Sequence, residues 1–187
     1  MCIRDRGTED NEESFLLVLS ALQSGASDTD LLDKMKDKNV YEKVGITAER
    51  AQNLVDYLEN KTDWLISHKA QCKALMKVIG KKQPKKYVKD DSKLDINKQA
   101  VKLFKSDMGM NMSRSLDKWN PADVWLYYDS SVPEHSTIAE LNKYLYDSIK
   151  GKKGIIGISL KKGIGKLDYK NYYPPEEKEL SKIDLKL

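Results

Sequence analysis

Two stretches of the chain decide the fold: Pro121-Ala-Asp-Val-Trp-Leu-Tyr-Tyr128 and Ile155-Ile-Gly-Ile-Ser-Leu-Lys161. Both are rich in β-branched or aromatic residues, and they predict strands over residues 124–128 and 155–160. Side chains alternate between the two faces of a strand. In the second stretch the side chains that would face a core are Ile156, Ile158 and Leu160. Those that would face the other way, leaving room above the sheet, are Gly157, Ser159 and Lys161.

A helix is predicted between these two strands. Apolar residues recur with helical spacing from Thr137 to Ile149, and Gly151 ends the pattern. Thr137 and Glu140 have the spacing of a capping box, in which each residue satisfies a backbone amide of the first turn. The segment therefore belongs to a domain of the α/β or α+β class.

The first half of the chain is predicted to be helical. Apolar residues recur at helical spacing over residues 10–24, 28–36, 47–58, 62–79 and 96–108. His68 and Cys72 lie on the apolar stripe of one of these segments, so Cys72 is expected to be buried and His68 to be packed or partly exposed. Residues 80–93 are polar and lysine-rich, contain Pro84, and are interpreted as a linker.

We divide the chain into three parts on this basis. Residues 1–9 match no helix or strand pattern, resemble a translated adapter, and are expected to lie outside the fold. Residues 10–93 form the helical portion with its basic linker, and residues 94–187 form the α/β core. Because residues 180–187 read as the start of an unfinished element, the C-terminus is expected to be truncated.

The composition excludes several classes of protein. The 187 residues are 40% hydrophobic and carry 33 basic and 29 acidic side chains, for a net charge of +4, which is typical of a folded chain. No apolar run reaches the roughly 18–20 residues of a membrane helix, so no membrane association is expected. Cys2 and Cys72 are far apart and form no metal-ligand pattern, which favours the reducing cytoplasm.

Positive charge is concentrated in two places. Residues 77–89 contain lysines and no acidic residue, and residues 150–170 contain lysines and a single acid. Each run is interpreted either as ordinary solvated surface or as a surface that faces phosphate groups.

Asp123 and Lys161 are the residues that could carry chemistry. A hard cation such as Mg²⁺ or Mn²⁺ needs carboxylate oxygens. It can polarise a phosphate and generate a nucleophilic water, while a nearby lysine stabilises that water and the developing charge. An aspartate at the start of one strand and a lysine on the neighbouring strand can provide this arrangement. Asp123 could also be only a strand-end turn residue, and Lys161 only a solvated lysine.

Pro121-Ala-Asp123, a strand, and then Ser159-Leu-Lys161 on a later strand resemble the core of the PD-(D/E)xK nucleases. The wider run Asp117-Lys-Trp-Asn-Pro-Ala-Asp-Val-Trp125 is similar to that of uncharacterised phage-type proteins of this class. The resemblance implies a restriction-endonuclease-like fold with a mixed sheet, and Mg²⁺-dependent cleavage of DNA. Family members carry an acid two residues before the lysine, and here Ser159 stands in that place.

Because Ser159 stands in the place of the family's acid, the second acid must come from elsewhere in the chain. The resemblance implies Glu13 first, since a helix before the sheet carries a glutamate to the metal in this fold; Glu13 could equally be a charge at a helix N-terminus. Glu140 is the second candidate, with the capping box as its other interpretation, and Asp129 is third but poorly placed.

Nucleic acid, with DNA expected, is the predicted partner. The residues that would contact it are Asn120, Lys161, Lys162 and Lys166. Two alternatives stay open: a nucleic-acid-binding protein whose nuclease fold has lost an acid, which Ser159 favours, and a phage structural or assembly protein whose basic surface contacts other proteins.

Overall fold

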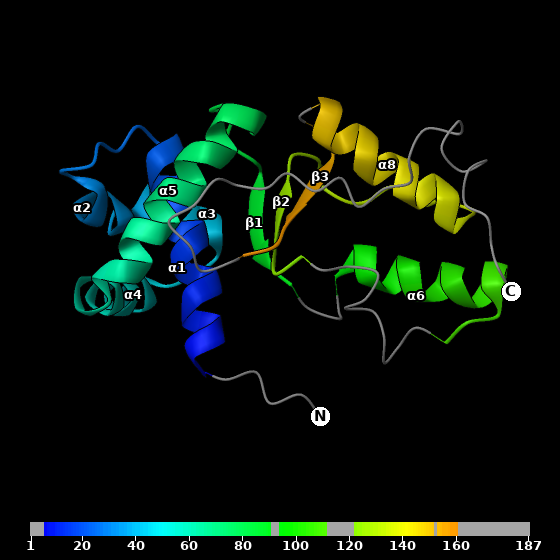
Figure 1. Ribbon diagram of the computed structural model, residues 1–187, viewed down its shortest axis with the longest axis horizontal. Helices are drawn as coiled ribbons and strands as arrows, with labels where there is room; N and C mark the ends of the chain where they lie inside the picture. Colours follow the sequence, from blue (N-terminus) through cyan, green and yellow to red (C-terminus); the bar gives the residue numbers. More distant parts are fainter. Residues whose placement is uncertain (1–5, 91–93, 112–121, 152, 161–187) are drawn as a thin grey trace, which may run out of the picture.

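The computed structural model describes residues 6–90, 94–111, 122–151 and 153–160 (Figure 1). Within these residues the chain forms seven helices and a three-stranded sheet, so the protein is of mixed α and β structure and mostly helical. Among the described residues, no helix combines the length and the apolar character needed to cross a membrane.

The first five helices form a bundle around α1. Their bounds are α1 (Arg6–Gln23), α2 (Leu31–Met35), α3 (Lys38–Val44), α4 (Ala48–Asn60) and α5 (Thr62–Ile79). Every side chain of α1 from Ser14 to Gln23 is buried, because α2 to α5 and the sheet pack around it. The hydroxyl of Thr47 accepts a hydrogen bond from the amide of Arg50 at 3.2 Å and caps α4.

The sheet has the order β1-β2-β3, and both of its strand pairs are antiparallel. Its strands are β1 (Lys86–Lys89), β2 (Val124–Tyr127) and β3 (Ile155–Ile158). In the register, Val124 lies opposite Lys89 of β1 on one side and opposite Ile158 of β3 on the other. The start of β2 therefore meets the ends of β1 and β3.

Helices cover both faces of this sheet (Figure 1). One face packs against the bundle through side chains that include Tyr87, Val124, Leu126 and Ile156. The other face packs against α6 (Asp95–Met108) and α8 (Ile138–Gly151) through side chains that include Val88, Trp125, Tyr127 and Ile155. Because successive side chains of a strand point to opposite faces of the sheet, a residue next to one on the bundle side lies on the α6 and α8 side.

Most of the predicted elements are confirmed. The strands predicted over 124–128 and 155–160 correspond to β2 and β3, and the helices predicted over 137–149 and 96–108 correspond to α8 and α6. Cys72 is buried, as its position on the apolar stripe of α5 predicted, and of the two alternatives for His68 the structure has the packed one.

Other expectations are wrong. Every strand pair that the structure describes is antiparallel, whereas a mixed sheet was expected. Residues 86–89 were assigned to a linker but form β1. The strand was missed because it is short, buries only Tyr87 deeply and carries lysines that hide the alternating pattern. Residues 6–9, assigned to the leader, belong to α1, and α3 was missed because only Val40 and Val44 mark its apolar side.

Candidate functional site

Asp123 and Ser159 lie side by side where β2 begins and β3 ends. The Oδ2 atom of Asp123 accepts a hydrogen bond from the hydroxyl of Ser159 at 3.2 Å and another from the amide of Leu160 at 2.6 Å. The amide of Asp123 in turn donates to the carbonyl of Ile158 at 2.9 Å. Two residues that are 36 positions apart in the sequence are thus brought together, as the two predicted strands required.

The same alternation assigns both residues to the α6 and α8 side of the sheet. Val124 and Ile158 pack on the bundle side, so their neighbours Asp123 and Ser159 project to the opposite side. Both side chains are only partly buried. A ligand arriving from solvent can therefore reach this end of the sheet.

Asp90 is a second carboxylate at this end of the sheet, and the sequence analysis missed it. Its amide donates to the carbonyl of Asp123 at 2.7 Å, which extends the pairing of β1 with β2 by one residue. Its Oδ1 atom accepts hydrogen bonds from Trp125 Nε1 at 2.8 Å and from Asn97 Nδ2 at 3.0 Å. The signal that could have found it is an acid two residues after Tyr87-Val88, a β-forming pair in the lysine-rich segment.

Trp125 fills the space above Gly157. A Cβ atom placed on Gly157 would lie 2.9 Å from Trp125 Cζ3 and 2.9 Å from the Cβ of Ala122. The expectation that the small residues of β3 leave room above the sheet is therefore wrong at Gly157. The indole ring extends across the sheet here because its Nε1 atom donates to Asp90, the residue after β1.

Glu13 does not join Asp123. It lies on α1, on the bundle side of the sheet, and its carboxylate forms ion pairs with Arg50 at 2.7 Å and with Lys89 at 2.9 Å. Burial alone would raise the pKa of Glu13, but the hydrogen bonds from Lys89 and Arg50 hold it below its ordinary value. The expected role of Glu13 beside a metal is therefore replaced by an ion-pair network that ties α1 to α4 and β1.

Glu140 forms half of the capping box that was its other interpretation, with its carboxylate on the amide of Ser136 instead of that of Thr137. Its amide donates to the hydroxyl of Thr137 at 3.2 Å, and its carboxylate accepts from the amide of Ser136 at 2.8 Å. Glu140 also lines a pocket that includes Asp129 and Gly154. Asp129 follows the end of β2 and Gly154 precedes β3, so both lie at the end of the sheet away from Asp123. It is therefore not placed as a partner of Asp123.

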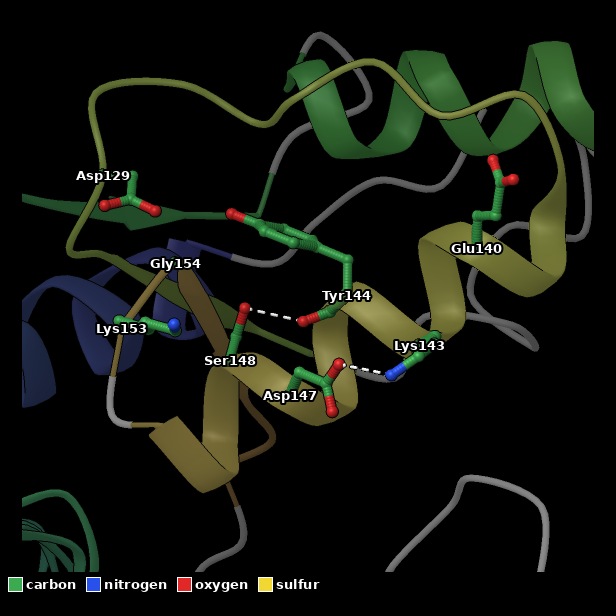
Figure 2. Close-up of a pocket in the computed structure, with 8 residues that line it drawn as sticks. All are labelled: Asp129, Glu140, Lys143, Tyr144, Asp147, Ser148, Lys153 and Gly154. Atoms are coloured by element: carbon green, nitrogen blue, oxygen red, sulfur yellow. Dashed lines mark hydrogen bonds and ion pairs between the residues drawn. The ribbon is translucent and has the colours of Figure 1, made fainter.

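Figure 2 shows this pocket, which is formed mainly by one side of α8, from Glu140 to Ser148, and by the loop that enters β3. Its polar groups largely bind one another: Lys143 forms an ion pair with Asp147 at 2.7 Å, and the hydroxyl of Ser148 donates to the carbonyl of Tyr144 at 2.7 Å. Asp129, the third acid considered, lies here and so is remote from Asp123. The pocket thus contains two of the acids considered for the metal, Glu140 and Asp129, but it includes neither Asp123 nor Ser159.

Four predicted site residues lie outside the described residues: Asn120, Lys161, Lys162 and Lys166. The described part of the site therefore consists of Asp123, Ser159 and Asp90. Among the described residues no group of three or more acidic, histidine or cysteine side chains could hold a metal ion. Mg²⁺ does not require such a group, because it keeps several waters and binds through one or two carboxylates together with substrate phosphates.

Asp123 meets that smaller requirement. One of its oxygens, Oδ2, is held by Ser159 and Leu160, whereas Oδ1 accepts no hydrogen bond from the described residues. A carboxylate that is fixed through one oxygen presents the other in a defined direction, which suits a hard cation. Comparison with protein families, with curated proteins and with solved structures gave no match to this chain.

Proposed function

We propose that the protein is a Mg²⁺-dependent nuclease of the restriction-endonuclease-like class that hydrolyses DNA phosphodiester bonds at the end of the sheet where Asp123 lies. One observation carries the proposal: Asp123 and Asp90, from adjacent antiparallel strands, have carboxylates on the same side of the sheet. Directly opposite residues of such a pair have Cβ atoms about 4.5–5.5 Å apart, which is close enough for two carboxylates to share one hydrated cation.

Asp123 would be the principal metal ligand, and Asp90 would bind the ion directly or through a water. When bound, Mg²⁺ would polarise the scissile phosphate and lower the pKa of an attacking water. Asp90 is held by Trp125 and Asn97, and Asp123 by Ser159 and Leu160. These hydrogen bonds fix the positions of both carboxylates before substrate arrives, so that little reorganisation accompanies binding.

Ser159 and Lys161 have separate roles in this proposal. Ser159 orients Asp123 through the hydrogen bond that its hydroxyl donates. Because its side chain is uncharged, Ser159 would not itself bind the metal. Lys161, which lies outside the described residues, directly follows Leu160 in the sequence, and the amide of Leu160 donates to Asp123. Lys161 would stabilise the attacking water and the charge that develops on the phosphate.

The test is metal-dependent cleavage of DNA by the full chain and by Asp123→Asn. Asparagine keeps the size of the side chain and an oxygen that can accept from the amide of Leu160, but it removes the charge that the metal needs. We expect cleavage with Mg²⁺ or Mn²⁺, none with EDTA, and a loss of at least about 100-fold in Asp123→Asn. Glu13→Gln is the control and should retain cleavage. Equal cleavage by wild type and Asp123→Asn would overturn the proposal.

A second function, nucleic-acid binding without catalysis, is favoured by one observation. Oδ2 of Asp123 already accepts two hydrogen bonds that tie β3 to β2, which is a complete structural role without any metal. In this alternative the wild type binds DNA with equal affinity in EDTA and in Mg²⁺ and cleaves none of it. Measuring binding and cleavage on the same substrate separates the two functions.

A further inference from the structure

Four exposed lysines stand on the turn that leads into β1, here called the lysine turn and defined as residues 81–86. They are Lys81, Lys82, Lys85 and Lys86. Among the described residues none of the four forms an ion pair with an acidic side chain. Lys85 instead donates to the hydroxyl of Ser130 at 3.2 Å, and Lys82 Nζ lies 5.8 Å from the centre of the Tyr128 ring.

Two glutamines hold the lysine turn against the end of α1. Gln23 Nε2 donates to the carbonyl of Lys82 at 3.2 Å, and Gln83 Nε2 donates to the hydroxyl of Ser24 at 2.8 Å. Gln83 also accepts a hydrogen bond from Lys43 of α3, and the ring of Pro84 is buried. The turn is therefore held by Gln23 at its backbone and by Ser24 and Lys43 at the side chain of Gln83.

Buried contacts beneath the turn complete its support. The hydroxyl of Tyr87, a residue that is 2% exposed, donates to Gln23 Oε1 at 2.6 Å. The amide of Lys85 donates to the carbonyl of Tyr127 at 2.7 Å, which continues the pairing of β1 with β2. The same glutamine thus joins the sheet, the helix and the turn.

The lysine turn gathers four exposed cationic side chains within six residues of the chain. Some lysines elsewhere are neutralised by a neighbouring acid: Lys34 pairs with Asp37 at 2.8 Å and Lys36 pairs with Asp33 at 2.9 Å. The four lysines of the turn have no such partner among the described residues. A preformed cationic surface of this kind loses little conformational entropy when it binds a polyanion.

We propose that the lysine turn binds the phosphodiester backbone of the nucleic acid that the Asp123 site acts on. This inference rests on the proposed function. The turn precedes β1 and Asp90 follows it, so the distance from Lys86 to Asp90 is about 13 Å at about 3.3 Å per residue. A strand of duplex DNA advances 3.4 Å per nucleotide, so about four phosphates span that distance. One strand would run along the edge of the sheet from the turn to the carboxylates.

The test compares two triple variants that remove the same charge from two different surfaces, the lysine turn and the exposed side of α6. The first is Lys81→Gln, Lys82→Gln, Lys86→Gln, which leaves Lys85 and its bond to Ser130 in place. The matched control is Lys98→Gln, Lys102→Gln, Lys105→Gln on the exposed side of α6. Binding of a fluorescein-labelled DNA duplex is measured in EDTA over a range of salt concentrations, so that cleavage plays no part.

We expect the turn variant to lose about tenfold or more in affinity and to reduce the slope of log K against log salt by about 2–3, since each lost phosphate contact contributes about 0.9. The α6 variant should bind like the wild type. Equal or greater loss in the α6 variant would overturn the inference while leaving the nuclease proposal intact. If the wild type binds neither duplex nor single-stranded DNA, both the inference about the lysine turn and the proposed nuclease function fail.

Discussion

The carboxylate of Asp123 accepts a hydrogen bond from the amide of Leu160 at 2.6 Å, so that the start of β2 holds the end of β3. The hydroxyl of Ser159 donates to the same oxygen at 3.2 Å. Asp123 thus has a structural role that does not depend on any metal.

Asp123→Ala should destabilise the fold because the amide of Leu160 loses its acceptor. We expect the free energy of unfolding to fall by about 1–3 kcal/mol, measured by urea denaturation in EDTA. Ser159→Ala removes only the weaker hydrogen bond and should cost about 0.5–1.5 kcal/mol. Asp123→Asn should stay close to wild type in stability, and a loss as large as that of the alanine variant would show that the charge itself is structural.

Gly157→Ala should destabilise the protein through overcrowding. The added Cβ would lie 2.9 Å from both Trp125 Cζ3 and Ala122 Cβ, closer than these groups can approach without shifting. Overpacking of this kind costs about 1–3 kcal/mol. Ala122→Gly should restore part of the lost stability when it is combined with Gly157→Ala in thermal unfolding. A double variant no more stable than Gly157→Ala alone would place the strain elsewhere.

His68 should make the stability of the protein depend on pH. Its Nε2 atom lies 3.1 Å from the hydroxyl of Ser14 in the buried interface between α1 and α5, and burial lowers the pKa of His68 from 6.5 to about 4. The unfolded chain therefore binds a proton that the folded protein excludes, so the stabilisation is complete above about pH 6.5 and is lost as the pH falls towards 4. The total loss from this group is about 3 kcal/mol.

The measurement is the free energy of unfolding at intervals between pH 7 and pH 4. His68→Gln should flatten the part of the profile above pH 5, where few carboxylates titrate, whatever its effect on absolute stability. An unaltered slope in His68→Gln would contradict the assignment.

Glu13→Gln should affect stability and spare function. The substitution breaks the ion pairs with Arg50 and Lys89, and hydrogen bonds to charged groups contribute about 1.5–3 kcal/mol each before the exposure of the partners is taken into account. Because the Glu13 side chain is 14% exposed and its partners are more open, we expect a total loss of about 1–3 kcal/mol by urea denaturation. Arg50→Gln is the matched variant and should cost a similar amount.

Low pH should remove the stabilisation by Glu13 in the wild type, because protonation breaks the same ion pairs. The pKa of Glu13 is held below its ordinary value of 4.5 in the folded protein, so its stabilisation is present above that pH and disappears as the pH falls below it. Glu13→Gln should therefore lose stability less steeply than wild type below pH 4.5. A variant that matched the wild type at pH 7 would show that the ion pairs contribute nothing.

The sequence by itself determined the local elements and one relationship within the site. The alternation of apolar and small residues in β3 places Ser159 on one face, and the antiparallel neighbour β2 delivers Asp123 beside it, because the period of a strand is a local property. The hydrogen bond from the amide of Glu140 to the hydroxyl of Thr137 could be predicted for the same reason, since the two residues lie within one helical turn.

Only the tertiary structure decided which charges meet. Glu13 is paired with Lys89, 76 residues away, and Asp90 is paired with Trp125, 35 residues away, and no local pattern encodes either contact. The filling of the space above Gly157 and the support of the lysine turn by Gln23 likewise depend on how the layers pack. Spacing along the chain predicts which side chains share an element, whereas the partner of a charged group is decided by packing between elements.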